Sequence, residues 1–271
     1  MSSNRTTRRT AEAWLAEGRP AAVVVVLETR GSAPRKSGTR MLVSAAQSVG
    51  TVGGGHLELA AIEAARGLIG GAVPPHQKHY PLGPALGQCC GGAVTLGFTR
   101  LDAQALAAWR EPEPLFHLQL YGAGHVGAAI ARVLSTLDVT VDWIDEREEM
   151  FPYALFEGQP WPANIRVVPM DQVWGEVSAA PPGAYYLVLT HSHDLDLKIT
   201  EKILKRGDFG YLGLIGSETK RARFVHRFEA LGIPMQRIAR MTCPIGIEGI
   251  LAKEPEIIAV SVVAQLLQEE D

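Results

Sequence analysis

Two cysteines stand side by side in the stretch LGQCCGG, where Cys89 and Cys90 follow Gln88 and precede two glycines. A disulfide between adjacent cysteines would be strained, and the spacing does not match that of a tetrahedral zinc site. Thiolates suit soft metals and sulfur chemistry, and the glycines favour an open or tightly turned backbone. Two interpretations stay open from the spacing alone: a functional pair of thiols, or two small apolar residues buried at the start of a strand.

A second candidate site is the glycine-rich stretch TVGGGHLE, in which Gly53, Gly54 and Gly55 lead with His56 into a helix. Backbone N–H groups at the start of a helix bind anions. The stretch TRGSAPRKSGTRM precedes it, and its basic residues either close on a phosphate-bearing ligand or form a solvated charged loop. These basic residues are Arg30, Arg35, Lys36 and Arg40.

A third candidate is the pattern G-x-G-x-x-G, formed by Gly122, Gly124 and Gly127 between an expected strand and an expected helix. The first glycine allows a tight turn, the second lets the backbone approach a pyrophosphate, and the third lets helix and strand pack closely. Asp145 ends the next expected strand and could accept hydrogen bonds from a ribose diol. The pattern predicts a site for NAD or another nucleotide. The alternative is a turn kept only for packing.

The stretch LTHSHDLD follows a later expected strand and carries His191, His193, Asp194 and Asp196. Ligands bind at the carboxyl ends of strands in such sheets, and two histidines beside carboxylates could also hold a metal. The alternative is a solvated loop in which Asp194 or Asp196 caps the next helix. The glycine turns GLIGS (213–217) and CPIGI (243–247) are expected on the same side, either at the ligand or as plain turns.

The pattern of apolar runs and turn residues divides the chain into two blocks, residues 1–110 and 115–271, joined by the proline-containing linker WREPEPLFH (109–117). The second block alternates strands and helices, which predicts a Rossmann-like, doubly wound parallel sheet with helices on both faces. The first block is expected to be a smaller α/β domain. Expected strands are 21–29, 38–45, 48–54, 91–98, 115–122, 139–145, 165–170, 184–190 and 211–216, and expected helices are 8–17, 53–70, 125–137, 197–207, 218–232 and 254–270.

The composition is that of a globular protein with a sizeable core: 271 residues, 46% of them hydrophobic and 20% charged. The formal net charge of -3 gives no sign of the basic face that nucleic acid requires. Three cysteines, an odd number, argue against a disulfide framework. The basic start MSSNRTTRRT is not followed by an apolar signal segment, and no apolar run is long enough to span a membrane. A cytoplasmic protein without a membrane segment is expected.

Taken together, these motifs resemble the xanthine dehydrogenase accessory proteins of the XdhC/CoxI family. The resemblance runs from about residue 10 to 268 and covers both blocks in order. It implies an N-terminal XdhC/CoxI-type domain followed by a Rossmann-like domain. The quoted stretches that carry it are ETRGSAPRKSGTRMLV, GTVGGGHLE, LGQCCGG, LYGAGHVG, WIDER, LTHSH, GLIGS and CPIGIEGILAKEPEIIAVSVVAQLL.

The function implied by the resemblance is that of a chaperone rather than a metabolic enzyme. Such proteins bind the molybdenum cofactor (molybdopterin), protect it while a sulfido ligand replaces an oxo ligand, and pass it to a xanthine dehydrogenase. A separate cysteine desulfurase supplies the sulfur. A homodimer is the default expectation for the assembly.

The resemblance also implies roles for particular residues. Gln88, Cys89 and Cys90 would contact the molybdenum centre or its sulfur, and Gly53–Gly55 with His56 would contact the phosphate or the pterin. The glycines of the G-x-G-x-x-G pattern and the aspartate after it keep their dinucleotide-type role. Two alternatives remain: an NAD(P)-dependent oxidoreductase that uses the Rossmann-like domain, and an adaptor that joins dehydrogenase and desulfurase without touching the cofactor.

Overall fold

The structure, a computed structural model, describes residues 4–82, 92–110, 113–152 and 162–268. The chain forms two compact units, unit 1 (Met1–Glu113) and unit 2 (Pro114–Asp271). The boundary lies inside the segment expected to be a linker (109–117), but two residues of that segment belong to the cores of the units. Trp109 is fully buried in unit 1, and Phe116 is buried in unit 2.

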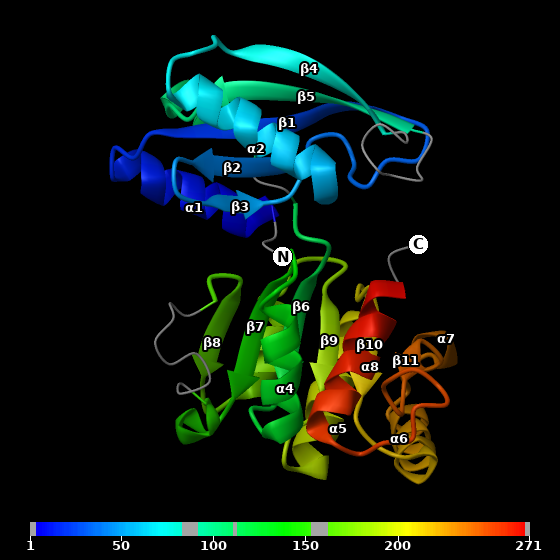
Figure 1. Cartoon of the computed structure of the whole chain (residues 1–271). Coiled ribbons are helices and arrows are strands. Elements are labelled where there is room, and N and C mark those ends of the chain that lie inside the picture. Colours follow the sequence, from blue (N-terminus) through cyan, green and yellow to red (C-terminus); the bar gives the residue numbers. More distant parts are fainter. Residues whose placement is uncertain (1–3, 83–91, 111–112, 153–161, 269–271) are drawn as a thin grey trace. The chain divides into compact units, whose positions relative to one another are not determined.

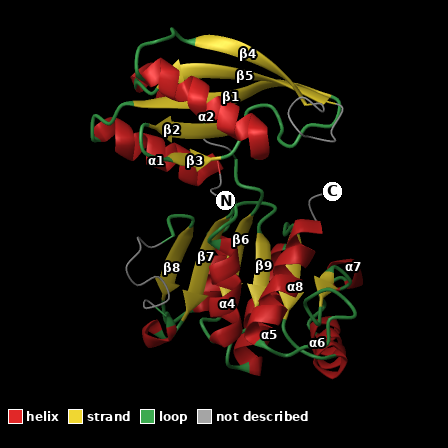
Figure 2. Ribbon diagram, viewed as in Figure 1, coloured by secondary structure: helices red, strands yellow, loops and turns green. Residues whose placement is uncertain are grey.

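Unit 1 is built on a five-stranded sheet with the order β3-β2-β1-β5-β4, in which all neighbouring strands are antiparallel (Figures 1 and 2). The strands are β1 (Ala21–Arg30), β2 (Arg40–Ser44), β3 (Ser48–Gly50), β4 (His76–Leu82) and β5 (Gly92–Arg100). The helices are α1 (Asn4–Ala16), α2 (Gly55–Ile69) and α3 (Ala103–Ala107).

The long apolar run of β1 is explained by burial on both faces of this sheet. Alternate residues of a strand point to opposite faces. Val24 and Val26 pack with Leu57 of α2 in one cluster, whereas Val23 packs with Trp14 of α1 in the other. The first part of the strand, Ala21–Val26, therefore needs no polar face, as the expected buried strand implied, whereas Leu27, Glu28 and Arg30 are exposed.

Strand β4 was not predicted, because its sequence HQKHYPL is mostly polar and contains a proline. It lies at the edge of the sheet and pairs only with β5, with Pro81 opposite Ala93. A proline is tolerated in an edge strand, since no second neighbour needs its missing N–H group.

Unit 2 is built on a six-stranded parallel sheet with the order β11-β10-β9-β6-β7-β8. Counted along this unit, the order is 6-5-4-1-2-3, the arrangement of a doubly wound dinucleotide-type fold, so the predicted Rossmann-like fold is confirmed. The strands are β6 (His117–Tyr121), β7 (Thr140–Asp145), β8 (Ile165–Pro169), β9 (Tyr185–Val188), β10 (Tyr211–Leu214) and β11 (Met241–Thr242). The helices are α4 (His125–Leu134), α5 (His193–Arg206), α6 (Glu218–Ala230), α7 (Met235–Ile238) and α8 (Pro255–Gln268), with short 3-10 turns η2 (Glu148–Met150) and η4 (Val173–Ser178).

Helices cover both faces of this parallel sheet, as predicted. Helices α4 and α8 lie against each other on one face, where Ile130 and Val262 join Leu120 of β6 in one core cluster (Figure 1). Helices α5 and α6 supply the other cluster, which includes Ile203 and Phe228. Among the described residues, no helix is both long and apolar enough to cross a membrane.

A buried carboxylate ties the strands of unit 2 together near their amino ends. Asp142 of β7 accepts hydrogen bonds from His117 Nε2 (3.0 Å) and Arg166 Nε (2.7 Å). Burial alone would raise the pKa of Asp142, but the hydrogen bonds and charges of these two residues lower it to about 2. The carboxylate therefore stabilises the fold in its charged form.

Candidate functional site

The glycine turn of unit 1 has the backbone conformation that only glycine adopts readily. Gly53, Gly54 and Gly55 have φ values of 148°, 76° and 57°. The Gly53 N–H donates to the Thr51 hydroxyl (3.2 Å), and the Gly54 N–H donates to the Glu58 carboxylate (3.2 Å), which also accepts from Thr51. Part of the predicted anion cradle is thus engaged by an internal carboxylate, which an incoming phosphate would have to displace.

Three of the stretches singled out in the sequence meet at one end of unit 1. A Cβ atom built on Gly53 would lie 2.6 Å from Cγ of Pro34 in the basic stretch. A Cβ on Gly92, two residues after Cys90 in the chain, would lie 2.6 Å from the Arg30 carbonyl oxygen. The close packing of bare backbone at both glycines holds the basic stretch between the glycine turn and the end of the cysteine stretch.

Two predicted residue sets in this region have different outcomes. Gln88, Cys89 and Cys90 lie outside the described residues, so their roles stay predictions. His56 is exposed on the first turn of α2.

Arg40 is fixed by the fold and is not free to close on a phosphate-bearing ligand; the expected strand over 38–45 already included it. It begins β2, its guanidinium carbon lies 5.3 Å from the ring centroid of Trp109, and its Nη1 donates to the Gly38 carbonyl (3.1 Å). Burial lowers the pKa of this guanidinium. No pattern in the sequence showed that Trp109, far along the chain, would pack against this guanidinium. Arg30 is exposed and pairs with Glu28 (3.1 Å).

The glycines of G-x-G-x-x-G in unit 2 have unequal structural roles. Gly122 has φ 121°, and a Cβ there would overlap the Leu189 carbonyl oxygen, while a Cβ on Gly127 would overlap the Gly122 carbonyl oxygen. In the part of the chain that the structure describes, no atom of another segment lies within 4 Å of a Cβ built on Gly124. The first and third glycines are required by the tight packing of turn, helix and strand. The second leaves bare backbone facing open space, as approach of a ligand would need.

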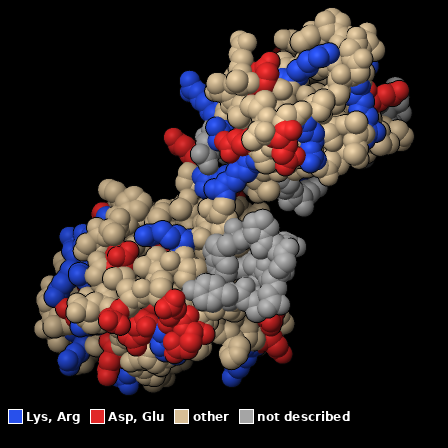
Figure 3. All heavy atoms as spheres, turned by 90° about the vertical axis from the view of Figure 1, so that its left-hand side faces the viewer, with Lys and Arg blue, Asp and Glu red and all other residues tan. Residues whose placement is uncertain are grey.

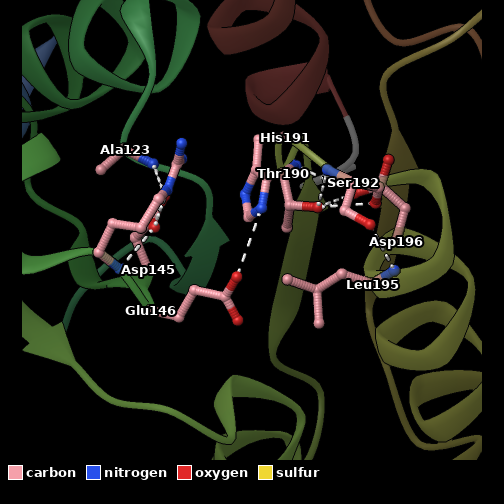
Figure 4. A network of polar contacts seen from close by, with 9 residues as sticks. Ala123, Asp145, Glu146, Thr190, His191, Ser192, Leu195 and Asp196 are labelled. Atoms are coloured by element: carbon pink, nitrogen blue, oxygen red, sulfur yellow. Dashed lines mark hydrogen bonds and ion pairs between the residues drawn. The ribbon is translucent and has the colours of Figure 1, made fainter.

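The carboxylate of Asp145 is fully engaged inside the protein (Figure 4). Oδ2 accepts from the Ala123 N–H (2.7 Å) and from Arg147 Nη2 (3.0 Å), and Oδ1 accepts from the Arg147 N–H (2.9 Å) and Nε (3.0 Å). Burial would raise the pKa of Asp145, but these bonds and the Arg147 charge lower it. A carboxylate has about four acceptor positions. Those that a ribose diol would use are already taken by the protein.

A cavity of about 260 Å³ opens at the carboxyl ends of β6, β7 and β9, beside this carboxylate. His191 lines it, and its Nε2 lies 3.4 Å from Oε1 of Glu146 (Figure 4). The two side chains come from the ends of β9 and β7, which is the crevice where doubly wound sheets bind ligands. The lining residues are Gly124–Gly127, Arg147, Met150, Leu189, Thr190, His191 and Ile215.

The other polar residues of LTHSHDLD build the start of α5 rather than a metal site. Ser192, not an aspartate, is the N-cap, and its hydroxyl accepts from the Leu195 N–H (3.4 Å). His193 and Asp194 are exposed in the first turn. Within the described ranges, no group of three or more histidine, cysteine or acidic side chains could hold a metal.

Asp196, the last of these residues, is fully buried in an ion pair. Its Oδ1 accepts from the Thr190 N–H (3.0 Å) and hydroxyl (2.7 Å), and its Oδ2 accepts from Lys220 Nζ (2.6 Å), which also donates to the Ile215 carbonyl (2.8 Å). This network fixes the turn after β9 to the GLIGS turn after β10. Near it, burial raises the pKa of the Cys243 thiol to about 11, despite the opposing charge of Lys220.

Arg147 and Lys220 were not singled out from the sequence, and Glu58 was placed on the first turn of the helix without a role. Glu58 carried a signal, since an acidic residue in the first turn of a helix interacts with the exposed N–H groups there. Arg147 stands two residues after Asp145, but that spacing alone does not show a pair. No local pattern links Lys220 to Asp196, because they are on different helices.

The model of the XdhC Rossmann domain matches residues 118–266, more than half of the chain, and the model of the XdhC and CoxI family matches residues 14–80. The chain belongs to the XdhC family. A curated relative is "Uncharacterized protein YqeB" from Escherichia coli (strain K12), 28% identical over 252 residues, which are 92% of this chain. This XdhC-family chain spans 43% of the length of that relative.

A solved structure shares the fold over nearly the whole chain. It is described as a xanthine dehydrogenase (BH1974) from Bacillus halodurans, with a TM-score of 0.78 and 19% sequence identity, covering 99% of this chain and 96% of that one. At this identity the likeness concerns the fold alone. It supports the Rossmann-like arrangement of unit 2 in an XdhC-family chain.

Proposed function

We propose that this XdhC-family protein is a molybdenum-cofactor-binding chaperone that serves a xanthine dehydrogenase. The observation that carries the proposal is the meeting, at one end of unit 1, of the glycine turn at Gly53, the basic stretch at Pro34 and the end of the cysteine stretch at Gly92. These are the parts that a soft metal centre on a phosphate-bearing ligand would need. Family membership and the name of the structural neighbour agree with this role.

In this proposal each part has a distinct task. Cys89 or Cys90 ligates molybdenum reversibly or holds a sulfur atom in transit, with Gln88 beside them. The N–H groups of Gly53–Gly55, with His56, hold the phosphate or pterin after the Glu58 carboxylate moves aside. The protein keeps the cofactor away from water and oxygen while a cysteine desulfurase supplies sulfur, then passes it to the dehydrogenase. We expect this to take place in the cytoplasm.

The oxidoreductase alternative depends on the crevice of unit 2, where two observations weigh against it. The Asp145 carboxylate is engaged by Arg147 rather than open to a ribose. A second cavity, of about 150 Å³, is also lined by Ile215. Its backbone polar groups are already hydrogen-bonded within the protein: the N–H and carbonyl of Gly246 bond to the Gln265 side chain, and the Ile247 N–H donates to the Ser261 hydroxyl. A nicotinamide carboxamide would need such groups to be available.

Reconstitution of a cofactor-free xanthine dehydrogenase tests the proposed role. The dehydrogenase is incubated anaerobically with limiting molybdenum cofactor, desulfurase and cysteine, with and without this protein. We expect the recovered activity to rise with this protein and to stay low with the Cys89→Ala/Cys90→Ala variant. Cys243→Ala, which removes the buried thiol, is the matched control and should behave as wild type. Equal activity with and without the protein would contradict the proposal, and NAD(P)-dependent turnover by the protein alone would favour the oxidoreductase.

A further inference from the structure

We infer that unit 1 holds a second ligand site, in which Arg40 binds the carboxylate of a small organic acid with an apolar body. The site is a cavity of about 470 Å³ on the face of the sheet where α1 and α3 pack. The inference goes beyond the proposed function, because the cofactor site assigned above lies at the other end of β5. Gly92, the last residue of the cysteine stretch, begins that strand, and Thr99 of the cavity lies about 23 Å further along it.

The floor of the cavity is one face of the sheet. Val25 of β1 stands opposite Arg40 of β2, and Val23 of β1 stands opposite Thr99 of β5. Residues that stand opposite each other on neighbouring strands point to the same face, so these four side chains share one surface. Helix α2 covers the other face, where it packs on the alternate residues of β1.

One wall of the cavity comes from α3 and the residue after it. Ala105 and Ala108 line the cavity with small side chains, which leaves room for an apolar group beside the two valines of the floor. The volume of about 470 Å³ lies within the roughly 300–1,000 Å³ of ordinary sites for small molecules. Every lining residue belongs to unit 1, so this unit alone supplies the site.

Arg40 is a partly buried cation that no carboxylate neutralises. Its Nη1 donates to the Gly38 carbonyl (3.1 Å), and its Nη2 lies 3.5 Å from the carbonyl oxygen of Ala108 at the cavity wall. Among the described residues it has no acidic partner, and a guanidinium carries more N–H donors than these two contacts use. Burial lowers the pKa of this group, and no negative charge offsets that effect. A carboxylate in the cavity would supply the missing charge.

The tryptophan against which this guanidinium packs also lacks an acceptor. Trp109 is fully buried, and its ring centroid lies 5.3 Å from the guanidinium carbon of Arg40. Its Nε1 donates to no acceptor among the residues that the structure describes. Buried N–H groups without an acceptor are rare in folded proteins. This corner of unit 1 therefore has a surplus of donors, which favours a ligand that brings acceptor oxygens.

Asp102 also lines the cavity, but it lies at the opposite end of α3 from Arg40. Its carboxylate accepts from the Ala105 N–H (2.7 Å) at the start of the helix, whereas Arg40 lies beside Ala108 after the end of the helix. The helix carries the chain about 9 Å between these two points. On the face of unit 1 that Figure 3 shows, basic and acidic side chains are interspersed, so contact with Arg40 rather than a broad field selects the anion.

The test measures binding of three probes to the full chain by NMR titration at constant ionic strength. Benzoate and hexanoate are acids with an aromatic and an aliphatic body, and benzamide is the neutral counterpart of benzoate. The variants are Arg40→Met, which removes the charge, Arg40→Lys, which keeps it, and Ala105→Leu, which fills the cavity from its wall.

Two control variants match these changes outside the cavity. Arg19→Met removes another arginine that packs on a tryptophan, since its guanidinium carbon lies 5.0 Å from the ring centroid of Trp14. Ala107→Leu adds the same side chain to the same helix at an exposed position that does not line the cavity. Denaturant unfolding confirms that each variant is folded.

We expect wild type to bind benzoate or hexanoate with a Kd on the order of 1 mM or tighter, and benzamide at least about 10-fold more weakly than benzoate. Arg40→Met should weaken binding of the acids by about 10-fold or more, because it removes a charge-assisted hydrogen bond. Arg40→Lys keeps the charge but loses the planar fork, so its affinity should lie between those of Arg40→Met and wild type. Ala105→Leu should weaken binding of acid and amide alike, and the controls should change it by less than about 2-fold.

Three results would each overturn the inference. The first is that neither acid binds wild type at about 10 mM, which is weaker than a specific site. The second is that benzamide binds as tightly as benzoate, which would show that the charge of the acid is not recognised. The third is that Arg40→Met and Ala105→Leu leave binding of the acids unchanged, which would place the acids elsewhere on the protein. None of these results bears on cofactor binding, which is measured separately with the Cys89→Ala/Cys90→Ala variant.

Discussion

Replacement of Gly127 by alanine should destabilise unit 2, whereas the same change at Gly124 should not. A Cβ on Gly127 would overlap the carbonyl oxygen of Gly122 and lie 3.1 Å from its carbonyl carbon, so backbone rather than a flexible side chain blocks it. The helix α4 or the turn before it must move to make room. At Gly124 the space is open and the backbone conformation suits any residue.

The expected magnitudes follow from these two environments. Overpacking in a tight site costs about 1–3 kcal/mol, and a backbone obstacle places Gly127→Ala at the upper end. Alanine is more favourable than glycine within a helix by about 1 kcal/mol, so the net loss in the free energy of unfolding should be about 2 kcal/mol. For Gly124→Ala, the loss of a glycine cap and the lower entropy of the unfolded chain nearly cancel, so the change stays within about 0.5 kcal/mol.

Scanning calorimetry and urea unfolding of the two variants measure this difference. A domain of this size shifts its melting temperature by about 2–4 °C per kcal/mol, so Gly127→Ala should lower that of unit 2 by about 4–8 °C. The transition of unit 1 serves as an internal control and should not move. The reasoning is refuted if Gly127→Ala is as stable as wild type, or if Gly124→Ala is the more damaging of the two.

Three further predictions concern buried groups of unit 2. Asp142 has a folded pKa of about 2 against an ordinary 3.8, so its stabilisation is present above about pH 4 and is lost as the pH falls toward 2. Asp142→Asn should therefore lower the free energy of unfolding by about 2 kcal/mol or less at pH 7. It should also reduce the loss of stability between pH 4 and pH 2, and an unchanged pH dependence of the free energy of unfolding would contradict this. With a pKa of about 11, the Cys243 thiol should resist iodoacetamide at pH 8 and react only after denaturation. The test uses a variant without Cys89 and Cys90 and reads the labelling by mass spectrometry. Rapid labelling of the folded protein would disprove the prediction. Lys220→Met should lower the free energy of unfolding by about 3–5 kcal/mol, because it leaves Asp196 buried and charged. The double variant Lys220→Met/Asp196→Asn should lose less stability than the sum of the two single variants. Strict additivity in urea unfolding would show that the two residues are not coupled.

Much of the fold is visible in the sequence because apolar periodicity and turn residues are local signals. The alternation of strands and helices after residue 115 predicts the parallel sheet of unit 2. The apolar run over 21–29 predicts β1, whose first part is buried on both faces. Strand β4 escapes because most of its residues are polar and exposed, and only Tyr80 and Leu82 are buried in the core. The extent of the linker is also misjudged, since Trp109 and Phe116 belong to cores that form from distant residues.

The candidate site is less predictable, because hydrogen bonds between distant residues decide it. The glycines at 53–55 and 122–127 are recognisable from their spacing. Three contacts depend on side-chain directions that no periodic pattern in the sequence shows. They are the Asp145–Arg147 pair, the Asp196–Lys220 pair and the hydrogen bond from the Gly54 N–H to Glu58. In each case a polar group that the sequence suggests as a ligand contact is already hydrogen-bonded within the protein.

The most direct test of the account is anaerobic retention of the molybdenum cofactor. Purified protein is mixed with extracted cofactor, free ligand is removed by ultrafiltration, and the retained molybdenum and pterin are quantified. Wild type is predicted to retain both near one equivalent, the Cys89→Ala/Cys90→Ala variant to lose them, and the Cys243→Ala control to match wild type. Equal retention by the double variant would mean that the adjacent thiols do not hold the cofactor and are packing residues. Absence of retention by wild type would contradict the claim that this chain carries the cofactor.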